Sequence, residues 1–267
     1  MGADIKTLRT RIKSVDSTLH LTKAMGLVAS SKIRRASEAM MRSREYSDAY
    51  ETAVGQLMGC KECEKSPYVL PREGNRTLLV AVAGDRGLAG GYNANIFRLL
   101  REYPDAQVIP VGKRACDRVE GETLLAETFS FREAKPIADR ICRAFLAGEV
   151  DRVGILCTKY HSLMSQEATV KWILPISVPA SEQTVSAVFE PDEITVLNAV
   201  IPDYVAGILV SCVKESFASE VAARRVAMDS AGKNAQEMID RLGLEYNRAR
   251  QGAITQEITE IVAGSGV

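Results

Sequence analysis

The first segment of the chain has the apolar spacing of a long amphipathic helix. Its apolar residues stand three and four positions apart, at Ile5, Leu8, Ile12, Val15 and Leu19. This spacing places the side chains along one seam and is typical of a left-handed coiled coil. The pattern predicts a helix from about residue 3 to 57, with these residues as its coiled-coil seam.

The last segment has a similar apolar face, from Ile208 to Ile261. All nine prolines lie between Pro67 and Pro202. The first 66 residues and the last 65 therefore lack the residue that most often breaks a helix. We therefore expect a coiled-coil helix at 1–58, a linker at 59–75, an α/β domain at 76–190 and a second coiled-coil helix at 191–267.

The middle of the chain alternates between strand-like and helix-like stretches. Strands are predicted at 76–83, 106–111, 122–131 and 151–158, and helices at 92–103, 113–120 and 134–148. These strand runs are apolar on both faces, which indicates a largely parallel sheet covered on both sides. The runs at 168–176 and 184–189 alternate more and suit additional or edge strands.

Charge and composition describe an ordinary globular chain. Of its 267 residues, 46% are hydrophobic and 25% charged, with a formal net charge of zero. Bulk charge thus favours neither nucleic acid nor an anionic membrane as the main partner. Residues 1–58 carry ten basic and six acidic side chains, and 203–267 carry seven and nine. The opposite signs favour pairing of the two ends. The basic face is either solvated or directed at an acidic protein.

No run approaches the roughly 18 to 20 apolar residues that span a bilayer, and the first residues lack a signal-peptide core. We therefore expect a cytoplasmic chain with reduced cysteines. Cys60 and Cys63 form a C-x-x-C pair, the pattern of half a zinc site or of a redox couple. A second pair is missing and His20 and His161 are distant in sequence, so we expect a thiol pair in a solvated loop and no metal site.

The glycine-rich stretch "AVAGDRGLAGGYNANI" at 81–96 resembles a phosphate-binding loop only in outline. A P-loop ends in Gly-Lys-Ser/Thr, and a dinucleotide loop reads G-x-G-x-x-G. Gly84 and Gly87 fit neither template, and Asp85 between them would repel a phosphate. We expect a structural or partner-facing turn, with no nucleotide or other cofactor bound.

Catalytic motifs are equally hard to place. The sequence contains no G-x-S-x-G and no H-E-x-x-H, and its two histidines form no constellation with a nucleophile. Asp192 and Glu193 stand at the start of the last helix, where the helix dipole favours acidic residues, and we expect them to act as caps. We expect a non-catalytic chain.

Ordered motifs across nearly the whole chain give a family resemblance. They are "RIKSVDSTLHLTKAMGLVASSKIRRA" (11–36), "GDRGLAGGYNANI" (84–96), "SLMSQEATVKWILP" (162–175), "FEPDE" (189–193), "ASEVAARRVAMDSAGKNAQEMIDRL" (218–242) and "YNRARQGAITQEITEIVAGSG" (246–266). With these the chain resembles the gamma subunits of F-type ATP synthases. Ala89 departs from the family, which often has Cys there, and residues 59–75 differ from the usual linker.

The resemblance implies a fold and a function. The terminal helices would form a long antiparallel coiled coil, joined to a central Rossmann-like α/β domain. The chain would be the rotary shaft of a membrane-bound ATP synthase, turning inside three alpha and three beta subunits. The epsilon subunit and the membrane ring of c subunits would bind below. Catalysis would belong to the beta subunits, and the chain would reach the cytoplasmic face of a bacterial plasma membrane only through the complex.

The resemblance also implies contact residues. Those facing acidic loops of the beta subunits would be Lys23, Met25, Asp85, Arg86, Gly87, Arg224 and Gln251. Glu190 would lie at the rotor foot. Basic side chains at Lys23, Arg86 and Arg224 suit acidic partners.

Two other functions fit parts of the sequence. A nucleotide-using α/β enzyme with helical extensions would bind labelled ATP or NAD tightly as an isolated chain. A cytoplasmic coiled-coil tether would purify without alpha, beta and epsilon partners. Neither explains the ordered motifs.

Overall fold

The computed structural model describes residues 2–119, 123–177, 179 and 189–264. The chain forms two compact units, one of residues 1–29 and 225–267 and one of residues 30–224. The first unit is helical, and the second contains a sheet with its covering helices.

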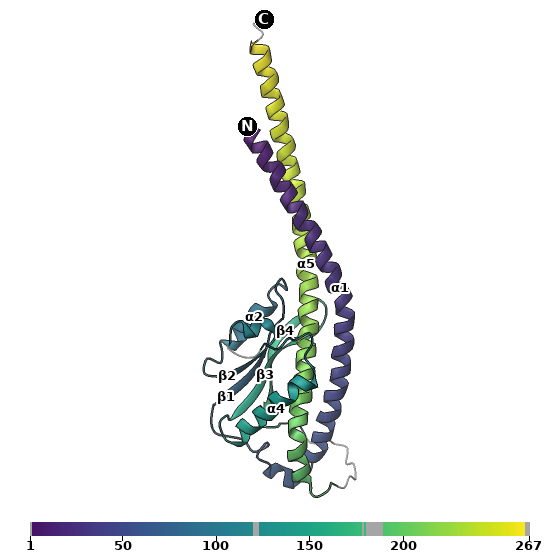
Figure 1. Cartoon of the computed structure of the whole chain (residues 1–267), viewed down its shortest axis with the longest axis vertical. Helices are drawn as coiled ribbons and strands as arrows, with labels where there is room; N and C mark the ends of the chain where they lie inside the picture. Colours follow the sequence, from purple (N-terminus) through teal and green to yellow (C-terminus); the bar gives the residue numbers. More distant parts are fainter. Residues whose placement is uncertain (1, 120–122, 178, 180–188, 265–267) are drawn as a thin grey trace. The chain divides into compact units, whose positions relative to one another are not determined.

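A long helix at each end of the chain is confirmed. Helix α1 runs from Gly2 to Met58, and α5 runs from Glu193 to Gly264 (Figure 1). The expectation that no segment has the length and apolarity to span a membrane is corrected by α5, which contains an 18-residue window of mean hydropathy 1.8. Because 61% of that window is buried within the protein, the apolar character of α5 is that of a core helix.

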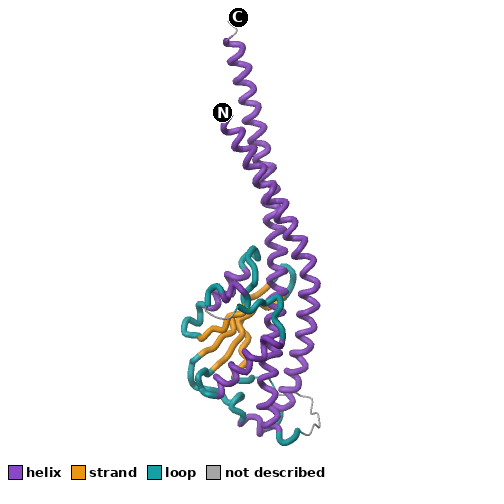
Figure 2. The backbone as a smooth tube through the Cα atoms, in the orientation of Figure 1, coloured by secondary structure: helices purple, strands orange, loops and turns teal. Residues whose placement is uncertain are grey.

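A four-stranded sheet, drawn in orange in Figure 2, lies in the second unit. Its strands stand in the order β2-β1-β3-β4 and are labelled in Figure 1. Its strands are β1 (Thr77–Val82), β2 (Gln107–Val111), β3 (Arg152–Tyr160) and β4 (Gln166–Leu174). Strand β1 pairs in parallel with β2 and β3, and β4 pairs antiparallel with β3. The prediction of a largely parallel sheet with an added edge strand is confirmed.

The buried residues explain why the sheet is covered on both faces. Leu78, Val80 and Val82 of β1 point into a core shared with α4 (Phe131–Leu146), α5 and the end of α1. Leu79 packs on the other face against α2 (Tyr92–Leu100) and α3 (Lys113–Cys116). Side chains alternate between faces along a strand, so a strand buried on both sides must be apolar throughout.

The strand predicted at 122–131 is wrong for its described part, residues 123–131. Residues 123–130 form a loop that ends at Ser130, the N-cap of α4, and Phe131 already belongs to that helix. The backbone N–H groups of Ala126 and Glu127 donate to the Asp85 carboxylate. A side chain thus takes the donors that a strand would present to its neighbour. Of the strand predicted at 184–189, residues 184–188 lie outside the described residues.

Candidate functional site

The cavity at the end of the turn after β1, residues 84–91, is too small for a nucleotide. The cavity lined by Gly91, Tyr92 and Thr158 measures about 120 Å³, and no charged side chain lines it among the residues described. Small-molecule pockets usually occupy about 300–1,000 Å³ and bind phosphate through cationic or backbone donors. The turn must therefore be understood through its contacts with the rest of the unit.

Asp85 fixes the turn to two neighbouring segments. Its carboxylate accepts backbone hydrogen bonds from Lys113 at 3.2 Å, Ala126 at 2.9 Å and Glu127 at 2.8 Å. Such a carboxylate replaces water with three fixed N–H donors. The side chain predicted to face a partner is thus engaged within its own chain.

Glu220 on α5 holds the turn from the other side, and sequence analysis missed it. The Glu220 side chain is 1% exposed and accepts the backbone N–H groups of Asp85 and Arg86, each at 3.3 Å. A Cβ added at Gly84 would lie 2.8 Å from Glu220 Cδ, so this close approach requires glycine.

Arg224 completes this buried contact. It forms an ion pair with Glu220, one helical turn away, and its Nε donates to the Gly87 carbonyl at 3.2 Å. Only 11% of the Arg224 side chain is exposed. A buried carboxylate needs such a partner, because leaving it unpaired is costly. Arg224, like Asp85, positions the turn.

The far end of the turn is also tied to α5. The buried Tyr92 hydroxyl donates to the Ser216 carbonyl at 2.8 Å, and burial raises the pKa of Tyr92. The side chain of Asn93 accepts the Gly84 N–H at 2.9 Å. Each side of the turn is therefore held to the second unit by hydrogen bonds.

The outward side of the turn remains accessible. The Arg86 side chain is 65% exposed, with Nη2 at 3.8 Å from Glu127 Oε2, and Leu88 is 62% exposed. Glu127 also binds Lys32 of α1 at 2.6 Å, and its carbonyl accepts from Lys214 at 3.3 Å. Burial lowers the pKa of Lys214. Arg86 and Leu88 are thus large side chains of the turn that remain exposed to solvent.

The two helices of the first unit approach each other around Leu19, the last residue of the predicted seam. Leu19 is buried, and the other four seam residues are half-buried between exposed neighbours. A Cβ added at Gly26 would lie 3.0 Å from Arg225 Nη1, and one at Gly232 would lie 3.6 Å from Thr22 Oγ1. Later positions of α1 therefore meet earlier positions of α5, which makes the pair antiparallel.

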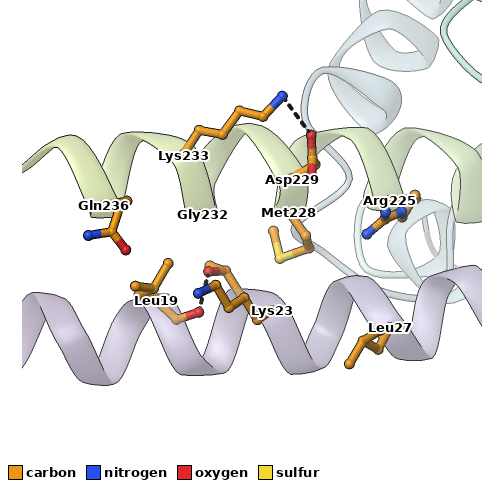
Figure 3. A pocket seen from close by; sticks show the side chains of 10 residues that line it. Leu19, Lys23, Leu27, Arg225, Met228, Asp229, Gly232, Lys233 and Gln236 are labelled. Atoms are coloured by element: carbon orange, nitrogen blue, oxygen red, sulfur yellow. Dashed lines mark hydrogen bonds and ion pairs between the residues drawn. The ribbon is translucent and has the colours of Figure 1, made fainter.

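A groove of about 430 Å³ lies between these two helices (Figure 3). Lys23, Arg225 and Lys233 contribute positive charge to it, whereas Asp229 is paired with Lys233 at 3.1 Å. Next to the groove the surface of α1 is apolar, with Leu27 70% exposed and lining the groove. A basic groove beside exposed apolar side chains is a surface suited to an acidic protein segment.

The remaining predicted contact residues lie apart from these features. Met25 is half-buried and Gln251 is exposed, both in the first unit. Glu190 is exposed just before α5. The cap predicted there is confirmed, because Asp192 accepts from the backbone N–H of Thr195 at 2.8 Å and this bond lowers its pKa.

The C-x-x-C pair is not in a solvated loop, which corrects that expectation. Cys63 is fully buried in the main core, within a short 3-10 helix at Lys61–Lys65, and burial raises its pKa to about 11. The described residues contain no group of three or more His, Cys, Asp or Glu side chains placed to hold a metal.

Comparison with known proteins bears on the whole chain. The ATP synthase family model matches residues 4–266. The ATP synthase gamma chain of Moorella thermoacetica is 37% identical over 277 residues, covering 98% of both chains. The sodium ion specific ATP synthase gamma chain of Acetobacterium woodii is 36% identical, covering 99% of both.

Solved structures agree on the fold. A chain of the Euglena gracilis mitochondrial ATP synthase, solved with OSCP, F1 and c-ring, matches with a TM-score of 0.69 at 20% identity, covering 100% of this chain and 97% of the other. A rotor chain of the same synthase matches with a TM-score of 0.64 at 19% identity, covering 95% and 100%. By sequence identity over its full length, the chain belongs to the family of ATP synthase gamma chains.

Proposed function

We propose that this chain is the central rotary shaft of a membrane-bound F-type ATP synthase. It couples ion flow through the membrane ring to ATP synthesis or hydrolysis on the beta subunits. The observation that carries the proposal is the full-length identity to gamma chains, which includes both terminal helices and the sheet. The chain itself is non-catalytic, and the nucleotide sites belong to the beta subunits.

The mechanism requires a stiff element with different faces. Three alpha and three beta subunits surround the helical pair, and each beta subunit meets a different face as the shaft turns. Its nucleotide affinity then follows the face that it contacts, which is a population shift driven by rotation. The half-buried seam and the close approach at Gly26 and Gly232 support this role, because they hold the two helices together.

The contacts to the beta subunits divide into two kinds. Lys23, Met25, Arg86 and Gln251 touch the partner, and the basic members meet acidic loops. Gly87 lies in the same turn as Arg86. Asp85 and Arg224 act indirectly, since their side chains hold the turn through the bonds described above.

The rotor foot is a second proposed contact surface. Glu190 lies there, towards the epsilon subunit and the ring of c subunits. The chain is held at the cytoplasmic face of a bacterial plasma membrane through these subunits.

Affinity purification of the chain from solubilised native membranes tests the proposal. Alpha, beta, epsilon and c subunits should copurify. Recovery of the chain alone, or with an unrelated set of proteins, would contradict it. The charge reversal Arg86→Glu should lower ATP hydrolysis by the purified complex, whereas Lys65→Glu, at a site with 67% of the side chain exposed, should not.

A further inference from the structure

Two cysteines far apart in sequence meet between the sheet and α5. Cys157 lies on β3 and Cys212 lies on α5, and both side chains line the same cavity, close enough for Cys212 to raise the pKa of Cys157. They are 5% and 4% exposed and belong to the same core. The shaft function described above assigns them no role.

A cavity connects this thiol pair to the surface. It measures about 470 Å³, and both cysteines line it. Its lining also includes Asp48 and Lys159, which are exposed. A small reagent can therefore enter from solvent and reach sulfur, which fully enclosed structural cysteines do not permit.

Charged side chains from three elements lie around the thiol pair, namely Lys171 on β4, Glu215 on α5 and Arg44 on α1. Lys171 on β4 favours the Cys157 thiolate and is itself bonded to Glu51 at 2.8 Å. Contact with Cys212 and burial act in the opposite direction, with Glu215 adding to them, and the net effect raises the pKa of Cys157. Arg44 on α1 binds Glu215. Cys157 is thus mostly protonated near neutral pH, and Lys171 stabilises its thiolate form.

We propose that Cys157 and Cys212 are a reactive dithiol that closes to a disulfide on exchange with a low-molecular-weight disulfide entering through this cavity. One thiolate attacks the reagent, forming a mixed disulfide and releasing one small thiol. The second cysteine then attacks the protein sulfur of that mixed disulfide and releases the other small thiol. The two protons lost by the cysteines are taken up by the two released thiolates, so the dithiol is oxidised and the reagent is reduced.

The bond would join β3 to α5 across a long loop. Closing a loop between residues 157 and 212 should raise the melting temperature of the second unit by on the order of 10 °C. A bond between Cys60 and Cys63 would close only a short loop and would stabilise less.

The test uses the full chain with Cys60→Ser, Cys63→Ala and Cys116→Ser, checked for folding by circular dichroism. It is incubated with hydroxyethyl disulfide at pH 8.5 until the reaction stops. The expected product has lost two hydrogen atoms by intact mass and contains one peptide pair linked through Cys157 and Cys212. Dithiothreitol should reverse both the mass change and the rise in melting temperature.

Matched variants make the outcome decisive. Adding Cys157→Ser or Cys212→Ser should abolish the linked product, and Lys171→Gln should slow its formation severalfold, because it removes the positive charge that favours the Cys157 thiolate. Cys142, buried beside Tyr68, should remain a thiol in every case. An unchanged mass, a stable mixed disulfide in the parent, or a linked product with no rise in melting temperature would overturn the proposal. The same peptide map on the chain with all six cysteines gives the answer if the triple variant does not fold.

Discussion

Removal of the Glu220 carboxylate is the sharpest test of how the turn at 84–91 is held. In Glu220→Ala the backbone N–H groups of Asp85 and Arg86 lose their acceptor, and Arg224 loses its ion-pair partner. Because Glu220 is 1% exposed and the Arg224 side chain 11% exposed, solvent replaces these bonds poorly.

The burial of this ion pair sets the size of the expected loss in stability. Breaking a buried ion pair by removing one partner costs about 3–5 kcal/mol. In a unit of this size each kcal/mol lowers the melting temperature by about 2–4 °C, so we expect a fall of about 10 °C. Glu220→Gln keeps the shape and one acceptor oxygen, and should fall between the parent and Glu220→Ala.

Differential scanning calorimetry of the full chain provides the assay, and Glu245→Ala provides a matched control. Glu245 also forms an i,i+4 pair with an arginine on α5, Arg241, but the two side chains are 53% and 74% exposed. An exposed helical pair contributes only about 0.3–0.5 kcal/mol. Equal melting temperatures for Glu220→Ala and Glu245→Ala would refute the reasoning, because they would show that burial adds nothing to this pair.

Three further predictions concern the shaft, catalysis and acid stability. The double change Ile12→Asp with Val15→Asp places two carboxylates in the half-buried seam. In vesicles that contain the intact complex, ATP-driven ion pumping should therefore fall more than ATP hydrolysis does. Equal pumping per ATP in mutant and parent would contradict this prediction. The isolated chain should show no ATPase activity, and turnover that survives purification but vanishes on changing one of its residues would show the opposite. Hydrogen bonds from Arg76 hold the pKa of Asp151 at about 2, below its ordinary 3.8, so this carboxylate stabilises the fold above about pH 4 and the gain is lost as the pH falls to about 2. The melting temperature of the parent should therefore drop more steeply over that range than that of Asp151→Asn, and parallel curves would contradict the assignment.

Much of the architecture follows from patterns that one sequence contains. The 3-4 spacing from Ile5 to Leu19 predicts a helix with one apolar seam, and an apolar run such as 77–82 predicts a strand that is buried on both faces. The failure at 122–131 has a local cause. Asp85, about forty residues earlier, takes the backbone donors of Ala126 and Glu127, and no periodicity in that stretch reveals a distant acceptor.

The site was less accessible to sequence reasoning. Glu220 and Arg224 form the same kind of i,i+4 pair that Arg241 and Glu245 form on the surface, so spacing alone does not separate them. A hint lay in the neighbours of Glu220, where Ala218, Val221 and Ala222 indicate a buried face. Lys23 and Arg86, the exposed side chains that we propose as partner contacts, could be named from the resemblance because they lie within its motifs.

Rotation of the chain relative to the beta subunits tests the central claim most directly. Met164, 74% exposed between β3 and β4, can be changed to Cys and biotinylated in a Cys60→Ser, Cys116→Ser background, with the beta subunits fixed to a surface. A bead bound at this position should turn in one direction when ATP is added, and should stop with a non-hydrolysable analogue. A bead that stays fixed while the same complexes hydrolyse ATP would contradict the assignment of this chain as the rotary shaft.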